Sequence, residues 1–317
     1  MRTASLIALA GMALGCQPPD ITLSHMSTMD SQTRGVVLYA DGQRGHAAMW
    51  DTTCEFDTLN GWIIGDHDLP TESEEIQDIY ADRVLGRSDE GAHVVQDPTA
   101  DLAQEWVTSA RLTEDGVVSL VSEGEHCMAV WQLDAHQRVP DAACLPGAAM
   151  TADPQSGQIF VGTEDGLLGI HPTEGTDTVG ESADLLVWDP VTELMYAATK
   201  GDAEVRGLDR DGAAVWTTEV PGSIKSLDDM GERGMVLVAV RTDTAGALVL
   251  LDGLTGKEHV VHETPPADDI EVTASDDGTT LAAVLSDRVY FYDVLAEGEE
   301  PKKRKTLGVE DAPVFTD

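Results

Sequence analysis

Two histidines in the C-terminal third have a spacing that could bind a metal ion. His259 and His262 stand three residues apart, and on a helix this spacing places two ligands on one face. The segment around them, Lys257-Glu-His-Val-Val-His262, has the character of a β-strand, in which residues three apart point to opposite faces. We therefore expect both histidines to lie at the surface of a strand, without a shared metal ion.

Two Asp-rich segments begin in the way that calcium-binding loops begin. They are Asp209-Arg-Asp-Gly212 and Ser275-Asp-Asp-Gly278. Neither continues to an acidic twelfth position with alternating ligands between, as a calcium loop does. Asp-Gly pairs between alternating apolar runs are typical of hairpin turns, and we predict turns at both places. The chain also lacks the nucleophile elbow, the zinc-protease motif and the phosphate-binding glycine loops.

The densest acidic segment is 66–78, and it is our candidate for contacting a partner. Its carboxylates, together with one nearby tryptophan, make up the candidate contact residues: Trp62, Asp66, Asp68, Glu72, Glu74, Glu75 and Asp78. We expect this segment to be an inserted loop, since long loops often carry function. A solvated loop that binds cations weakly is the alternative. Trp106 and Trp131 are further contact candidates, although tryptophan also serves in internal packing.

Three cysteines follow Cys16, namely Cys54, Cys127 and Cys144. A predicted hairpin turning at residues 134–137 would bring Cys127 opposite Cys144, so we predict a disulfide between them. Two buried thiols are the alternative. A zinc site with His126 and His136 is disfavoured, because the spacing matches no CxxC pattern.

The N-terminus reads as an export signal. Residues 1–15 combine one arginine with an apolar run that is too short to span a membrane. Ala13-Leu-Gly-Cys16 resembles the lipobox of bacterial lipoproteins, which implies that Cys16 carries lipid and that residues 16–30 form a tether. Ordinary signal cleavage is the alternative. The resemblance implies a lipid-anchored protein of the bacterial cell envelope, and Gln17 after the cysteine favours the outer membrane.

Composition and charge exclude several partners. The chain has 317 residues, 42% of them hydrophobic, and a formal net charge of −39. This fits a globular protein, and the charge disfavours nucleic acid and a basic face on anionic lipid. The acidity also suits a saline habitat, where it reflects the solvent and no partner. The basic run Lys302–Lys305 is expected on an exposed outer strand, with lipid headgroups or an acidic neighbour as the alternative contact.

One phrase, an apolar strand that runs into an Asp or Pro turn, occurs seven times. The copies end at positions 51, 97, 134, 172, 209, 252 and 293, so the period is about 40 residues. A period near 40 with several short strands per repeat predicts an all-β, seven-bladed β-propeller of four-stranded antiparallel blades over residues 31–317. We expect residues 21–24 or 312–315 to supply the strand that closes the ring. The predicted core includes Val236, Val238, Leu248 and Leu250.

The repeats resemble the YVTN-type and WD-repeat-like bacterial propellers, above all over residues 147–300. Ser275-Asp-Asp-Gly278 followed by an apolar strand carries the resemblance, whereas the Gly-His partner of the eukaryotic repeat is missing. The resemblance implies a fold and no single function. We expect a scaffold that binds a protein or an envelope component, with a monomeric body and no cofactor. The alternative is a lactonase-like hydrolase centred on the channel, with or without a divalent cation.

Overall fold

The computed structural model describes most of the chain after residue 19. The described ranges are 20–26, 33–39, 42–49, 52–58, 63–68, 73–80, 83–88, 91–94, 107–113, 116–124, 127–133, 137–139, 147–163, 165–171, 175–285 and 288–295. Residues 1–19, which include Cys16 and the predicted signal peptide, lie outside them, as do Lys302–Lys305 and residues 312–315. Within the described ranges, no helix is long and apolar enough to cross a membrane.

The described strands form seven antiparallel sheets, six with four strands and one with three. Four of the sheets lie in the first 180 residues. Their strands are β2 (Thr33–Leu38), β3 (Arg44–Met49), β4 (Thr52–Asp57) and β5 (Ile63–Asp68); β6 (Ser73–Tyr80), β7 (Arg83–Ser88) and β8 (Gly91–Val94); β9 (Val107–Thr113), β10 (Gly116–Gly124), β11 (Cys127–Gln132) and β12 (Gln137–Arg138); and β13 (Gly147–Ala152), β14 (Ile159–Thr163), β15 (Gly166–His171) and β16 (Gly175–Gly180).

The other three sheets complete the molecule. Their strands are β17 (Leu185–Asp189), β18 (Leu194–Ala198), β19 (Glu204–Leu208) and β20 (Ala214–Glu219); β21 (Ser223–Asp229), β22 (Met235–Arg241), β23 (Gly246–Asp252) and β24 (Glu258–Thr264); and β25 (Ile270–Ala274), β26 (Thr280–Leu285), β27 (Arg288–Leu295) and β1 (Asp20–Met26). A short 3-10 helix, Gly231–Arg233, lies between β21 and β22.

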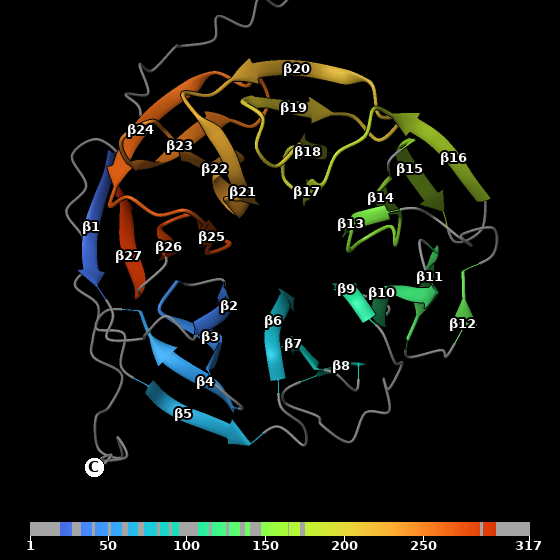
Figure 1. Cartoon of the computed structure of the whole chain (residues 1–317), viewed down its shortest axis with the longest axis horizontal. Helices are drawn as coiled ribbons and strands as arrows, with labels where there is room; N and C mark the ends of the chain where they lie inside the picture. Colours follow the sequence, from blue (N-terminus) through green and yellow to red (C-terminus); the bar gives the residue numbers. More distant parts are fainter. Residues whose placement is uncertain are drawn as a thin grey trace, which may run out of the picture.

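The sheets stand side by side in a closed ring around a central opening (Figure 1). The first strand of each repeat is innermost, so β2, β6, β9, β13, β17, β21 and β25 surround the centre. Each of these strands contacts the innermost strand of the next sheet, and β25 contacts β2. The N-terminal strand β1 closes the ring, because it pairs with β27 from Asp20 opposite Leu295 to Met26 opposite Tyr290.

The repeated phrase occupies the same place in six of the seven sheets. Six copies fall on the third strand of the repeat in chain order, namely β8, β11, β15, β19, β23 and β27, whereas the first copy falls on β3, the second strand of its sheet. The all-β prediction with four-stranded antiparallel sheets is therefore confirmed. The predicted turns also form: Gly212 donates to the carbonyl of Asp209 with φ +76°, and Gly278 donates to that of Ser275 with φ +63°.

The acidic segment 66–78 is not a loop, and this prediction was wrong. Its first residues belong to β5, the outermost strand of one sheet, and its last belong to β6, the innermost strand of the next. The segment is thus the passage from one sheet to the following one. An innermost strand borders the central opening, so it tolerates acidic residues that a buried strand would exclude.

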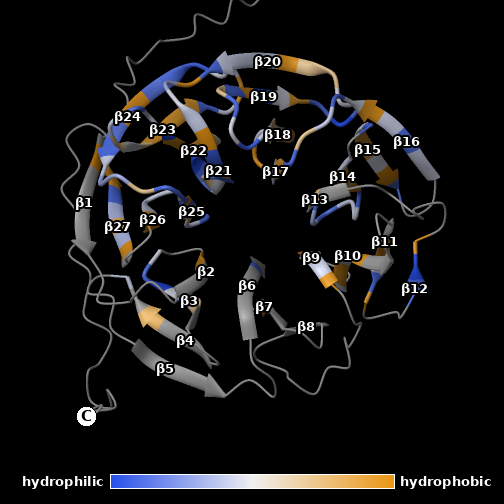
Figure 2. Cartoon of the chain, in the orientation of Figure 1, coloured by the Kyte–Doolittle hydropathy of each residue, from blue (hydrophilic) through white to orange (hydrophobic). Residues whose placement is uncertain are grey.

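The hydrophobic core lies between neighbouring sheets. One cluster joins Leu248 and Leu250 of β23 to Leu281 of β26, and another joins Val236 and Val238 of β22 to the sheet that precedes them. The four predicted core residues are fully buried, as expected. Figure 2 shows the hydrophobic colour on β23, whereas the outermost strand β24 of the same sheet is mostly hydrophilic.

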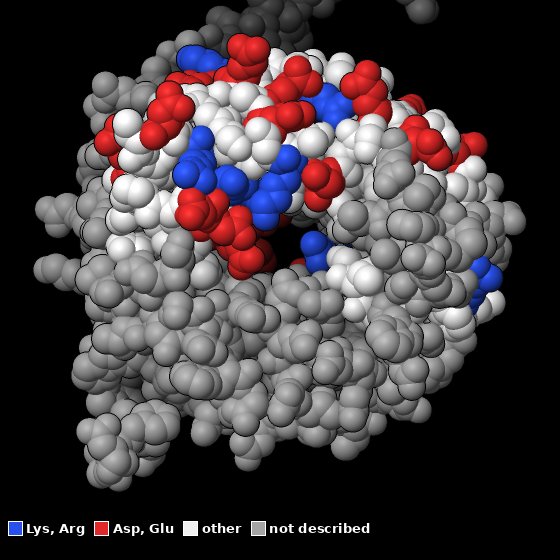
Figure 3. All heavy atoms as spheres, viewed as in Figure 1, with Lys and Arg blue, Asp and Glu red and all other residues white. Residues whose placement is uncertain are grey.

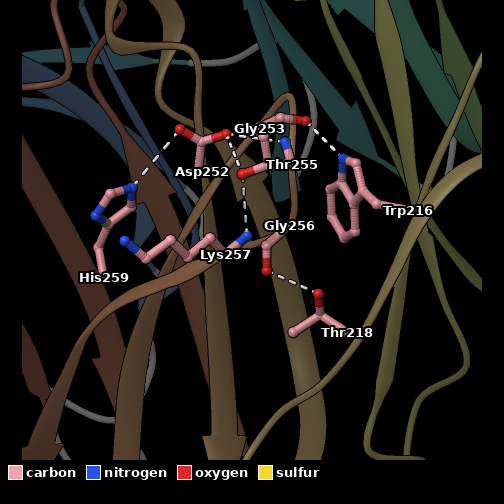
Figure 4. Close-up of polar contacts among 8 residues, drawn as sticks. All are labelled: Trp216, Thr218, Asp252, Gly253, Thr255, Gly256, Lys257 and His259. Atoms are coloured by element: carbon pink, nitrogen blue, oxygen red, sulfur yellow. Dashed lines mark hydrogen bonds and ion pairs between the residues drawn. The ribbon is translucent and has the colours of Figure 1, made fainter. Parts of the chain in front are cut away.

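Trp216 on β20 joins two neighbouring sheets (Figure 4). Its Nε1 donates to the carbonyl of Gly253 at 2.7 Å, and the Thr218 hydroxyl donates to the carbonyl of Gly256 at 2.7 Å. Both carbonyls belong to the turn between β23 and β24. Asp252 shapes that turn by accepting bonds from the backbone N–H and the hydroxyl of Thr255. The outermost strand of one sheet is thereby fixed to a turn of the next.

Candidate functional site

A cavity of about 750 Å³ occupies the centre of the ring and is lined by the innermost strands. The space-filling view shows it as an opening in the middle of the molecule (Figure 3). Pockets of roughly 300–1,000 Å³ with convergent polar groups are the usual binding sites of small molecules. This cavity is therefore the candidate site of the described structure.

Seven side chains at one register position surround the cavity. In each repeat, the innermost strand pairs with the strand that follows it up to a last pair of residues, for example Asp189 opposite Leu194. The residue two positions earlier lines the cavity in all seven repeats. These residues are Val37, Asp78, Arg111, Thr151, Val187, Asp228 and Thr273.

Three of these seven side chains bind the next sheet. Asp78 accepts a bond from the N–H of Leu112 at 2.7 Å, Thr151 from that of Trp188 at 3.2 Å, and Asp228 from that of Ala274 at 2.8 Å. An innermost strand has an edge with unpaired backbone groups, and a side-chain acceptor from the neighbouring sheet satisfies one of them. The polar residues of the cavity thus also hold the ring together.

The acidic end of the cavity is built by two neighbouring turns. The N–H of Glu232, between β21 and β22, donates to the carbonyl of Asp276, between β25 and β26, at 2.6 Å. This contact places Glu232 and Asp276 beside Asp228 and Asp229 at the end of β21, and all four line the cavity.

These carboxyl groups have raised pKa values. Burial raises the pKa of Asp228 to about 7, against the opposing effect of the bond from Ala274 N–H and a bond from Thr273. Burial and the adjacent Asp228 raise the pKa of Asp229, although Gly231 N–H donates to it. Burial followed by the charges of Asp277 and Glu232 raises the pKa of Asp276. The cluster therefore holds protons more tightly than free aspartates do.

Two other buried aspartates accept hydrogen bonds from the residues of turns. Asp189 is fully buried and accepts bonds from Val191 N–H at 2.8 Å, from the Thr192 hydroxyl at 2.8 Å and from the Tyr196 hydroxyl at 2.7 Å. Asp153 caps the equivalent turn of the preceding sheet and pairs with Arg210 at 3.0 Å. Burial, followed by the charge of Asp189, raises the pKa of Tyr196, which keeps the phenol protonated as a donor.

Charged side chains lie along part of the edge of the opening in Figure 3. Two exposed ion pairs lie among the described residues, Lys200–Asp269 at 3.2 Å and Arg241–Asp268 at 2.7 Å. Their members come from the loop after β18, the last residue of β22 and the segment that enters β25. We call this group, Lys200, Arg241, Asp268 and Asp269, the charged rim. Its members are exposed, so they are available to a partner.

Of the contact candidates from the acidic segment, Asp78 lines the cavity. Trp62 and Glu72 lie outside the described residues. The described residues include the backbone, but not the side chains, of Asp66, Asp68, Glu74 and Glu75. Trp106 lies outside as well, and Trp131 packs against a hydrophobic cluster, which is the internal role.

The cysteine and histidine predictions have different outcomes. The hairpin over β11 and β12 forms, with Gln132 opposite Gln137. Cys127 begins β11, but Cys144 lies outside the described residues, so the disulfide stays a prediction. His259 pairs with Asp252 at 3.7 Å, whereas the ring of His262 contacts the ring of Tyr292 at 5.3 Å between centroids. The described part of the chain contains no group of three or more potential ligands suited to a metal ion.

The sequence analysis missed Arg111, Asp228 and Asp229. Each is an unremarkable residue in its own repeat, and only the closed ring brings them to one cavity. A signal did exist in the adjacent pair Asp228-Asp229, which follows the apolar Leu227 at the end of a strand. Aligning the seven repeats at these turns and taking the residue two positions earlier would have revealed the seven positions that line the cavity.

The comparisons with known proteins identify the fold. No family model and no curated protein sequence matches the chain. Among solved structures, a chain of the "Mitotic Checkpoint Complex" is similar, with a TM-score of 0.62 and 12% identity over 93% of this chain and 97% of that one. The "RRP9 WD40 repeats" are similar with a TM-score of 0.60 and 13% identity over 88% and 99%. The chain therefore has the fold of WD40-repeat β-propellers.

Proposed function

We propose that this protein is a seven-bladed propeller of the bacterial cell envelope, anchored by lipid on Cys16, and that it acts as a scaffold for a protein or an envelope component. The observation that carries the scaffold role is the charged rim. It presents exposed charges from three separate segments of one ring of sheets. Rigid elements that present loops are the usual basis of recognition.

Three further observations support the proposal. The described strands form seven sheets, and each contains one copy of the repeated phrase. One similar structure is a chain of the "Mitotic Checkpoint Complex". In addition, Asp78 and Asp228 accept backbone N–H bonds that join the sheets, which gives these cavity carboxylates a structural task and favours binding over hydrolysis.

The proposed anchor residue, Cys16, is close in sequence to the start of β1. β1 begins at Asp20, four residues after Cys16, and four extended residues span at most about 14 Å. β1 is also the outermost strand of its sheet. A lipid on Cys16 would therefore hold the outer edge of the ring close to the membrane and leave the charged rim accessible.

Phase partitioning in a cloud-point detergent tests the anchor. We expect the wild-type protein in the detergent phase and Cys16→Ser in the aqueous phase, because more than one buried acyl chain gives stable membrane binding. Equal partitioning of the two proteins would contradict lipidation.

Site-specific photocrosslinking in cells of the source organism tests the scaffold role. A photoreactive residue replaces Asp268 of the charged rim, and a matched variant carries it at Val215, which is 53% exposed on the outermost strand β20. We expect a discrete adduct of constant mass from position 268 and none from position 215. If position 268 gives no adduct, or if both give the same one, the charged rim is not the binding surface.

A further inference from the structure

The central cavity has a large excess of negative charge on its described lining. Its acidic residues are Asp78, Asp184, Asp228, Asp229, Glu232, Glu271 and Asp276, whereas Arg111 is the one basic residue among the described lining residues. A cavity lined by one sign of charge between low-dielectric walls concentrates ions of the opposite sign. Charge thus selects a cation.

No basic side chain among the described residues forms an ion pair with the acidic end of the cavity. Within the described ranges, the ion pairs involve other carboxylates, such as Asp269, Asp268 and Asp153, and none involves Asp228, Asp229, Glu232 or Asp276. The turns that carry these four groups are held together by the bond from Glu232 N–H to Asp276 carbonyl. The carboxyl groups are therefore held in position before any ligand arrives.

Apolar side chains also line part of the cavity wall. Val37 comes from β2, Val187 from β17 and Val284 from β26. A bare metal ion gains nothing from such a wall, and the described residues contain no metal-ligand cluster. An organic cation, by contrast, has an apolar body that the wall can cover and a head that carboxylates can bind.

We propose that the central cavity binds a small aliphatic amine, with its ammonium group between Asp228 and Asp276 and its methylene chain along the valine wall. The amine donates hydrogen bonds to carboxylate oxygens at the acidic end. The volume of about 750 Å³ is ample for a diamine or polyamine. This site lies inside the ring and is independent of the charged rim, so it goes beyond the proposed scaffold role.

The raised pKa of Asp228 gives the proposal a second readout. Burial raises that pKa to about 7, so the carboxyl is partly protonated near neutral pH. An ammonium ion beside it favours the ionised form. We expect binding near pH 7 to release protons to the buffer, which calorimetry detects as a heat that depends on the ionisation enthalpy of the buffer.

Isothermal titration calorimetry of the full chain tests the site, with cadaverine as the probe and its diol analogue as the uncharged control. The ionic strength is physiological, since a Debye length of about 8 Å screens the remote surface charges. Asp228→Asn removes one charge and keeps an oxygen that can accept from Ala274 N–H. Asp268→Asn makes the same charge change on the charged rim, outside the cavity lining. Asp276→Asn is a second cavity variant at an exposed turn, in case Asp228→Asn fails to fold.

We expect one saturable site for cadaverine in the wild type, about tenfold weaker binding in either cavity variant and a change below about twofold in Asp268→Asn. The diol should not bind. The proposal is overturned if cadaverine gives no saturable binding, if Asp268→Asn weakens binding as much as the cavity variants do, or if magnesium ions compete for the same site with higher affinity.

Discussion

The contact between Trp216 and two glycines allows a quantitative test of how the sheets are joined. An added Cβ on Gly256 would lie 2.4 Å from Cε3 of Trp216, and the backbone there has φ +67°. A left-handed conformation costs a non-glycine residue about 1–2 kcal/mol, and overpacking costs about 1–3 kcal/mol. We therefore expect Gly256→Ala to lower the free energy of unfolding by about 2–5 kcal/mol.

Substitutions at two other glycines separate the cost of overpacking from the cost of backbone strain. A Cβ on Gly207 would lie 2.3 Å from Trp216, in a strand without positive φ, so Gly207→Ala should cost about 1–3 kcal/mol from overpacking. Gly201 has φ +100° and no atom within 4 Å of its added Cβ, so Gly201→Ala should cost about 1–2 kcal/mol from backbone strain alone.

Urea unfolding followed by far-UV circular dichroism measures these changes without depending on tryptophan fluorescence. A double-mutant cycle with Trp216→Ala completes the test. The smaller side chain removes the Trp216 contacts and leaves the Thr218 hydroxyl 2.6 Å from the added Cβ, so Gly256→Ala should then cost less than in the wild-type background but more than Gly201→Ala. If Gly256→Ala costs the same in both backgrounds, the Trp216 contact does not join these sheets as described.

Three further predictions concern the buried aspartates. Asp189→Ala leaves the donors of Val191, Thr192 and Tyr196 without their acceptor. We expect urea unfolding to show that the free energy of unfolding falls by about 2–4 kcal/mol. A negligible change would contradict the role of Asp189 in the turn. Arg210→Ala leaves the buried Asp153 without its cation and should lower the midpoint temperature of thermal unfolding. Lys200→Ala breaks an exposed ion pair and should leave that temperature unchanged. Equal shifts would refute the distinction between the buried pair and the exposed pair. The pKa of Asp228 rises from 3.8 to about 7 on folding, so the folded state binds more protons between these values. The contribution of Asp228 to stability is therefore present below pH 4 and is lost as the pH rises through 7; Asp228→Asn should flatten the measured pH dependence in this window, and an unchanged slope would exclude Asp228 as its source.

The repeat was predictable because its signals are local. An apolar strand followed by an Asp turn, as in Gly246–Asp252, specifies a strand and its end without reference to the rest of the chain. The burial of Val236, Val238, Leu248 and Leu250 follows from the same pattern, since the middle strands of each sheet are covered on both sides.

The acidic segment and the cavity were not predictable in the same way. Charge density alone suggested a loop at 66–78, but β6 uses its acidic residue Asp78 to bind the N–H of Leu112 in the next sheet. That bond connects residues 34 positions apart, and the ring of seven positions connects residues from Val37 to Thr273. Such a site depends on closure of the ring, and no local sequence pattern indicates which residues that closure brings together.

The pairing of β1 with β27 has a consequence for the order of folding. Asp20 meets Leu295 across almost the whole length of the chain, whereas the other neighbouring strands in each sheet follow one another closely in sequence. Local hairpins form early, and contacts of such long sequence separation form late because loop closure must precede them. β1 leaves the ribosome long before β27 does, so β1 must wait unpaired until β27 has been synthesised. A product truncated before residue 288 has no partner for β1 and leaves an open strand edge, the feature by which unfinished chains aggregate or are recognised for degradation.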